Sequence, residues 1–87
     1  MFYYVYLLYC GKDGSTYVGF TSDLKKRLTY HQAGKTKTTR ERGPVKFIYA
    51  ESYLNQTDAR KREKFLKSGR GREVIKKQLA ETFAGIV

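Results

Sequence analysis

Two short apolar runs at the start of the chain constrain its fold more than any other feature. Residues 2–10 and 15–20 alternate in side-chain character and are rich in tyrosine, and Gly-Lys-Asp-Gly at 11–14 joins them. Alternation with a period of two is typical of β-strands, and glycine and aspartate supply the backbone conformations that tight hairpin loops require. The sequence therefore predicts an antiparallel β-hairpin over residues 2–20.

Two tyrosines are predicted to share one face of this hairpin. With a four-residue loop at 11–14, Tyr6 pairs with Gly19, and Tyr17 lies diagonal to Tyr6. A two-residue turn at 13–14 would shift the pairing by two and keep both tyrosines on that face. Glycine within a strand often marks close approach by a ligand or another group. We expect a pocket floored by Gly19 and walled by the two phenols; filling of the core by tyrosine is the alternative.

The remaining segments predict one strand and three helices. A helix follows the cap candidates Thr-Ser-Asp at 21–23 and ends at Gly34. A third strand opens at Pro44, with Val45, Phe47 and Tyr49 on one face. Two more helices are predicted at about 57–67 and 71–83, with Ser-Gly-Arg-Gly at 68–71 between them.

The resulting order, β-β-α-β-α-α, indicates an α+β fold. Its centre would be a small antiparallel three-stranded sheet flanked by helices. A chain of 87 residues is too short to sustain two separate cores. We therefore expect residues 1–87 to form a single domain.

The charge balance points to a polyanionic partner. Eighteen Lys and Arg residues against eight acidic residues give a formal charge of +10 at pH 7. Such an excess favours nucleic acid, and nine of the basic residues lie between positions 60 and 77. The residues expected to contact the nucleic acid are Gly19, Lys35, Lys37, Arg40, Arg42, Arg60, Lys64, Lys67, Arg70 and Arg72.

Specificity for a base sequence is not expected, because no helix-turn-helix, zinc finger or other base-reading module is recognisable. Tyr30 and Tyr53 are candidates for stacking on bases, which would favour single-stranded or branched DNA. The same contacts would serve RNA equally well. A basic surface that docks an acidic protein is a further interpretation of the charge.

Cysteine usage and hydropathy suggest a cytoplasmic protein. The single cysteine, Cys10, excludes an internal disulfide and a cysteine-based zinc site, which suits a reducing compartment. No run of 18 apolar residues occurs, and residues 1–9 lack the basic region and cleavage site of a signal peptide. We therefore expect no membrane contact.

The helix that follows residue 23 carries polar side chains on its inward side. Leu24, Arg27, Leu28 and His31 fall within one arc of about 100°, with Arg27 and His31 at the border of its apolar stripe. This arc must face the sheet. The alternatives to a functional role are a hydrogen-bonded structural histidine and an arginine whose stem covers apolar surface.

A carboxylate occupies the inward side of the helix at 57–67. Glu63 shares this stripe with Ala59 and Leu66. Because an unpaired buried charge is costly, Glu63 must meet a cation, which is either a side chain or a metal ion. An intrahelical pair with Lys67 or Arg60 would be sufficient.

The order of these residues resembles the GIY-YIG nuclease superfamily. The resemblance is carried by Tyr-Val-Tyr at 4–6, Tyr-Val-Gly at 17–19, Asp-Leu-Lys-Lys-Arg-Leu-Thr-Tyr-His at 23–31 and Ala-Arg-Lys-Arg-Glu-Lys-Phe-Leu-Lys at 59–67. More narrowly, the chain is similar to small stand-alone members related to the nuclease domain of the excision-repair protein UvrC. The match spans nearly the whole chain.

This resemblance implies a DNA endonuclease that depends on a divalent metal, Mg²⁺ or Mn²⁺. The catalytic residues that it implies are Tyr6, Tyr17, Arg27, His31 and Glu63. Of these, Glu63 corresponds to the metal ligand and Tyr17 to the general base. One carboxylate together with a substrate phosphate can hold Mg²⁺, which keeps several of its waters.

Three positions differ from the family pattern. Tyr4 stands where the name-giving glycine would be, and Phe20 replaces a lysine that follows the second motif in some relatives. The asparagine found after the glutamate in several relatives has no clear counterpart in residues 71–79. Tyr4 and the missing asparagine support an alternative function, a non-catalytic nucleic-acid-binding module that retains the nuclease fold.

Overall fold

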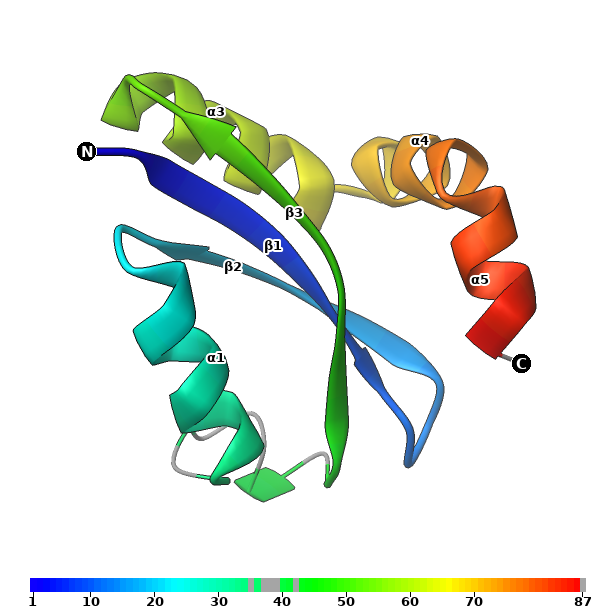
Figure 1. Cartoon of the computed structure of the whole chain (residues 1–87). Helices are drawn as coiled ribbons and strands as arrows, with labels where there is room; N and C mark the ends of the chain where they lie inside the picture. The colour runs from blue at the N-terminus through cyan, green and yellow to red at the C-terminus, as the bar shows by residue number, and fades with distance from the viewer. Residues whose placement is uncertain (35, 37–39, 42, 87) are drawn as a thin grey trace.

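The computed structural model describes residues 1–34, 36, 40–41 and 43–86 (Figure 1). Its elements are β1 (Tyr3–Cys10), β2 (Ser15–Thr21), α1 (Leu24–Gln32), β3 (Val45–Tyr53), α3 (Gln56–Lys67), α4 (Gly69–Gln78) and α5 (Ala80–Ile86). The three strands form one antiparallel sheet in the order β2-β1-β3. This architecture confirms the predicted α+β class. None of the described helices is both long enough and apolar enough to span a membrane.

The hairpin has the register that a four-residue loop predicts. Tyr6 pairs with Gly19, and Leu8 pairs with Tyr17. The loop closes at Gly14, whose N–H donates to the carbonyl of Cys10 at 2.8 Å. Gly14 has a φ of +72°, a conformation that glycine adopts without strain.

The third strand departs from the alternation that we predicted. Its pairing with β1 runs from Leu7–Tyr49 directly to Leu8–Phe47, so that Ile48 is an extra residue in a β-bulge. Phe47 therefore lies on the face of Tyr6, and Tyr49 lies on the opposite face. The prediction that Val45, Phe47 and Tyr49 share one face was wrong, because an inserted residue reverses the alternation beyond it.

Helices cover both faces of the sheet, which buries the central strand. On one face, α3 and α4 enclose the core formed by Val5, Leu7, Val18, Ala59, Leu66 and Ile75. On the other face lies α1 (Figure 1), whose His31 contacts the side chain of Tyr6. As a result, β1 contributes five buried residues, each at most 1% exposed: Val5, Tyr6, Leu7, Leu8 and Cys10.

Polar side chains define the helix boundaries. The Asn55 side chain caps α3 by accepting from the N–H groups of Thr57 and Asp58. Ser68 ends α3 and caps α4 through the N–H of Gly71. A β-carbon at Gly71 would overlap the backbone of α3, so the two helices meet closely at this glycine.

The predicted helix at 71–83 is in fact two helices, α4 and α5. The chain leaves the helical conformation at Leu79, which has a ψ of +31° and packs against the core. This break directs α5 away from the axis of α4 (Figure 1).

A hydrogen-bonded network joins β3 to α3. The Glu51 carboxylate accepts from the hydroxyls of Tyr49 and Tyr53, each at 2.7 Å, and from the Arg62 guanidinium at 3.0–3.2 Å. Burial would raise the pKa of Glu51, but these hydrogen bonds and the charge of Arg62 outweigh it and lower that pKa. Tyr53, a candidate for stacking on bases, is half-buried, and its hydroxyl is bonded within this network.

Candidate active site

A cluster of ring side chains lies between β1, β2, β3 and α1. The hydroxyl of Tyr6 lies 3.1 Å from Nε2 of His31, and both residues are buried. Phe47 stacks on the ring of Tyr6 at a centroid distance of 5.1 Å, and Tyr17 meets His31 edge-on at 6.2 Å. Both predicted catalytic tyrosines, Tyr6 and Tyr17, thus converge on the predicted catalytic histidine.

Helix α1 brings Arg27 and His31 to this cluster. Its first turn is fixed by Asp23, whose carboxylate accepts from the N–H of Lys26 at 3.0 Å. Arg27 lies one helical turn before His31, on the same side of the helix. Its charge contributes to the pKa values of both Tyr6 and His31, so the guanidinium lies within electrostatic reach of the cluster.

The environment of His31 favours a neutral imidazole. Burial lowers its pKa below the ordinary value of 6.5, and the positive charge of Arg27 lowers it further. The second ring nitrogen, Nδ1, lies 3.0 Å from Oγ1 of Thr36. Because a neutral imidazole has one donor and one acceptor nitrogen, the ring donates one of these two hydrogen bonds and accepts the other.

The environment of Tyr6 favours a protonated phenol. Burial raises its pKa to about 12, although the charge and hydrogen bonding of Arg27 act in the opposite direction. The negative charges of Tyr17 and Glu63, if present, would raise it as well. Tyr6 is therefore a hydrogen-bonding group at neutral pH and not a proton acceptor.

The pocket that we expected above Gly19 is filled by Tyr6 itself. A β-carbon at Gly19 would overlap the ring of Tyr6. Gly19 thus accommodates the close approach of a protein side chain, and the predicted ligand space between two phenols was wrong.

Glu63 on α3 lies within electrostatic reach of Tyr6. Its side chain is only 14% exposed, and it accepts from Arg60 Nη1 at 3.0 Å and from Lys67 Nζ at 2.9 Å. Burial would raise the pKa of Glu63, but these two cations outweigh it and lower that pKa. The intrahelical ion pairs considered as an alternative for Glu63 are therefore present, and both involve residues also expected to contact nucleic acid.

The carboxylate of Glu63 fits a hydrated divalent ion that is bound partly by the protein and partly by a substrate phosphate. Among the described residues, no group of three or more His, Cys, Asp or Glu side chains could hold a metal ion. Mg²⁺ is commonly bound through one or two carboxylates, with water and phosphate oxygens completing its shell. Glu63 supplies one such carboxylate, and an ion there would replace Lys67 or Arg60 on its oxygens.

A surface pocket of about 390 Å³ adjoins Arg27 and includes Lys26 and Tyr30 in its lining. Tyr30 is 39% exposed, and Nζ of Lys26 lies 5.7 Å from the centre of its ring. Tyr30, a candidate for stacking on bases, is thus exposed next to Arg27.

The basic residues are distributed over several surfaces. Arg60 lies over the ring of Phe20, at 3.7 Å from its centroid. Exposed positions on α3, on α4 and beyond α1 hold Lys64, Lys67, Arg70, Arg72 and Arg40. Lys35, Lys37 and Arg42 lie outside the described residues.

Sequence reasoning missed two members of the cluster, Thr36 and Phe47. Thr36 follows α1, and no spacing rule connects a loop threonine to a histidine five residues earlier. Phe47 was assigned to a face together with Tyr49, and only the bulge at Ile48 places it against Tyr6.

Comparisons with known proteins agree with the family that the sequence motifs resemble. The model of the GIY-YIG catalytic domain matches residues 2–77. UPF0213 proteins of Clostridium perfringens and Streptococcus pneumoniae are 48% and 46% identical over 65 residues, or 74% of this chain. These matches cover 69% of the former protein and 65% of the latter, so the chain spans less than two thirds of the streptococcal relative.

A solved structure shows the same fold. The solution NMR structure of a UPF0213 protein from Bacillus halodurans is 38% identical, with a TM-score of 0.55. The similarity covers 86% of this chain and 82% of that protein. Together with the matched catalytic-domain model, these similarities show that the chain belongs to the GIY-YIG family of nucleases.

Proposed function

We propose that this protein is an endonuclease that hydrolyses DNA phosphodiester bonds with a divalent metal ion and little sequence specificity. The observation that carries the proposal is the convergence of Tyr6, Tyr17 and His31, with Arg27 within electrostatic reach. Membership of a nuclease family and a formal charge of +10 support a nucleic-acid substrate.

Arg27 has the role of stabilising the phosphoryl group. Its guanidinium adjoins both the ring cluster and the pocket that contains Tyr30. A planar guanidinium can donate two parallel hydrogen bonds to phosphate oxygens, where negative charge grows in the transition state. The neighbouring Tyr30 is positioned to stack on a base, which would favour single-stranded or branched substrates.

The two tyrosines take different roles. Tyr6 is buried and stays protonated, so it holds His31 in place through the contact with Nε2. Tyr17 is half-buried and edge-on to His31, and we assign to it the removal of a proton from the attacking water. A neutral His31 can accept that proton onward because its lowered pKa keeps it uncharged.

Glu63 would hold the metal ion. A divalent cation there would place positive charge beside the phosphoryl oxygens and the leaving oxygen. Phe20, which differs from the lysine of some relatives, holds the Arg60 guanidinium over its ring. Arg60 thereby keeps a positive charge 3.0 Å from Glu63.

The ion pairs of Glu63 favour a second candidate function. If Arg60 and Lys67 occupy the carboxylate permanently, the protein would bind nucleic acid without hydrolysing it. The absence of the family asparagine and the presence of Tyr4 agree with this candidate.

The two candidates differ in one measurement. Labelled single-stranded, duplex and branched DNA, and matched RNA, are incubated with wild type, Glu63→Gln and Glu73→Gln, with and without Mg²⁺ or Mn²⁺. Glu73 is an exposed carboxylate on α4 and serves as the charge-matched control. We expect metal-dependent cleavage by wild type and Glu73→Gln only, with DNA binding retained by all three. Binding without cleavage by wild type would support the non-catalytic function.

A further inference from the structure

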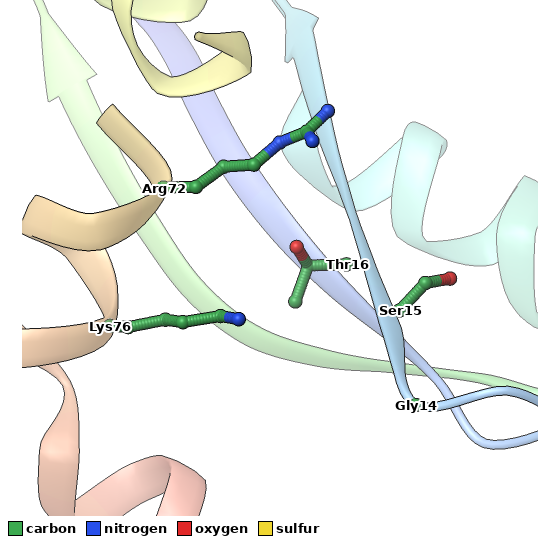
Figure 2. Close-up of a pocket in the computed structure, with 5 residues that line it drawn as sticks. All are labelled: Gly14, Ser15, Thr16, Arg72 and Lys76. Carbon is green, nitrogen blue, oxygen red and sulfur yellow. The ribbon is translucent and has the colours of Figure 1, made fainter. Parts of the chain in front are cut away.

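A second polar pocket, of about 300 Å³, lies between α4 and the start of β2. Its lining residues are Gly14, Ser15, Thr16, Arg72 and Lys76. Figure 2 shows the side chains of Arg72 and Lys76 reaching from α4 towards β2, with Thr16 between them. Two cations and a hydroxyl group thus line a space that is large enough to admit a phosphate group.

Among the described residues, neither of the two cations has an acidic partner. Arg72 and Lys76 lie one turn apart on the same side of α4, and within the described part of the chain neither forms an ion pair. Glu73 lines a different depression, with Arg70 and Lys77. Like charges at this spacing repel one another and destabilise a helix. An anion between them would relieve this repulsion.

A third cation lies on the same face of the sheet. Thr16 pairs with Tyr9 across β1, and Tyr9 pairs with Lys46 on β3. Residues paired across strands point to the same face, so Lys46 shares this face with Thr16. The positive charge therefore extends beyond the pocket along one row of the sheet.

The pocket and the active site lie on opposite faces of one edge strand. Side chains alternate along β2, so Thr16 points towards α4, whereas Tyr17 points towards α1. Thr16 is three residues from Gly19, or about 10 Å along the strand. Because β2 is at the edge of the sheet, a flexible chain can pass from one face to the other around it.

We propose that this pocket binds a phosphate group of the nucleic-acid strand, at a position away from the scissile bond. Arg72 can donate two parallel hydrogen bonds to phosphate oxygens, and Lys76 adds a point charge. The five lining residues include no aromatic or large apolar side chain that would hold a base, so the charged group is the ligand. The proposal rests on a nucleic-acid substrate, but it does not require hydrolysis.

The test measures binding in the absence of divalent cations. The affinity for a labelled single-stranded oligonucleotide is determined over a range of salt for wild type, Arg72→Gln/Lys76→Gln and Lys61→Gln/Lys77→Gln. The control pair lies on α3 and α4, removes the same charge and leaves the pocket lining intact. Amide NMR shifts of Gly14, Ser15 and Thr16 are followed with the oligonucleotide and, separately, with inorganic phosphate.

We expect the pocket variant alone to lose the oligonucleotide-induced shifts and to reduce the slope of log affinity against log salt by about one. If both double variants lose the amide shifts and the salt slope to the same extent, the proposal is overturned. The positive charge of the protein would then act only as a diffuse electrostatic field. Shifts caused by inorganic phosphate but not by the oligonucleotide would also overturn it. A wild type that binds through this pocket but does not cleave would contradict the nuclease function and leave the pocket assignment standing.

Discussion

The ring of Tyr6 lies over Gly19, its partner on the neighbouring strand, and no side chain at position 19 would fit beneath it. The hydroxyl of the same tyrosine reaches Nε2 of His31 at 3.1 Å. The missing side chain of Gly19 therefore determines how deeply the ring sits and where its hydroxyl is held.

Replacement of this glycine should lower the stability of the fold. We expect Gly19→Ala to lower the free energy of unfolding by roughly 1–3 kcal/mol, because the added carbon forces the Tyr6 ring from its place. Urea denaturation measures this effect. Gly85→Ala is the control, since Gly85 in α5 has open space around it. Equal stability of Gly19→Ala and wild type would show that the ring can move at no cost.

The hydroxyls of Tyr6 and Tyr17 should prove unequal. Tyr17→Phe should lower single-turnover cleavage by roughly 10²–10⁴, the usual contribution of a positioned general base. Tyr6→Phe should lose less activity but about 1 kcal/mol of stability, because its hydroxyl is buried and bonded. An inactive Tyr6→Phe beside an active Tyr17→Phe would reverse the two roles.

Arginine geometry should matter at position 27. Arg27→Lys keeps the charge but loses the planar pair of donors, so we expect the cleavage rate to fall by at least ~10². Lys25→Arg in the same helix is the control for replacing one basic residue type by the other, because Lys25 is exposed to solvent. A wild-type rate for Arg27→Lys would assign the Arg27 side chain to covering apolar surface.

The lowered pKa of His31 should appear in the dependence of stability on pH. Above the ordinary value of 6.5 the imidazole is neutral in both the folded and the unfolded chain. Below it, the unfolded chain binds the proton first, so folding stability is lost as the pH falls through the folded-state pKa. Between about pH 7.5 and 5.5, wild type should therefore lose more stability than His31→Gln. Equal losses of stability in wild type and His31→Gln would contradict a lowered pKa of His31.

The network around Glu51 should stabilise the joint between β3 and α3. Glu51→Gln leaves Arg62 without its counter-charge, and we expect a loss of roughly 1–3 kcal/mol in the free energy of unfolding. Because the folded-state pKa is lowered, this contribution is complete above the ordinary value of 4.5 and disappears as the pH falls further. Glu73→Gln should stay within about 0.5 kcal/mol of wild type.

Much of the fold could be predicted because local rules determine it. Alternation and the Gly-Lys-Asp-Gly loop were enough for the hairpin register, including the pairing of Tyr6 with Gly19. Helical spacing was enough to turn His31 and Glu63 inwards. The remaining features depend on contacts between distant segments, which spacing does not encode. The network of Glu51 with Arg62, the stacking of Phe47 on Tyr6 and the break at Leu79, which packs against the core, are of this kind.

The bulge at Ile48 allows β3 to serve two separate clusters, with Phe47 against Tyr6 on one face and Tyr49 against Glu51 on the other. The number of residues in β3 therefore determines which of its side chains join each cluster. Deleting a residue on either side of the bulge would exchange the faces of the side chains before or after the gap, whereas deleting Ile48 itself would remove the bulge and keep Phe47 and Tyr49 on their present faces. Among natural variants, we expect β3 to tolerate substitutions more readily than insertions or deletions of a single residue.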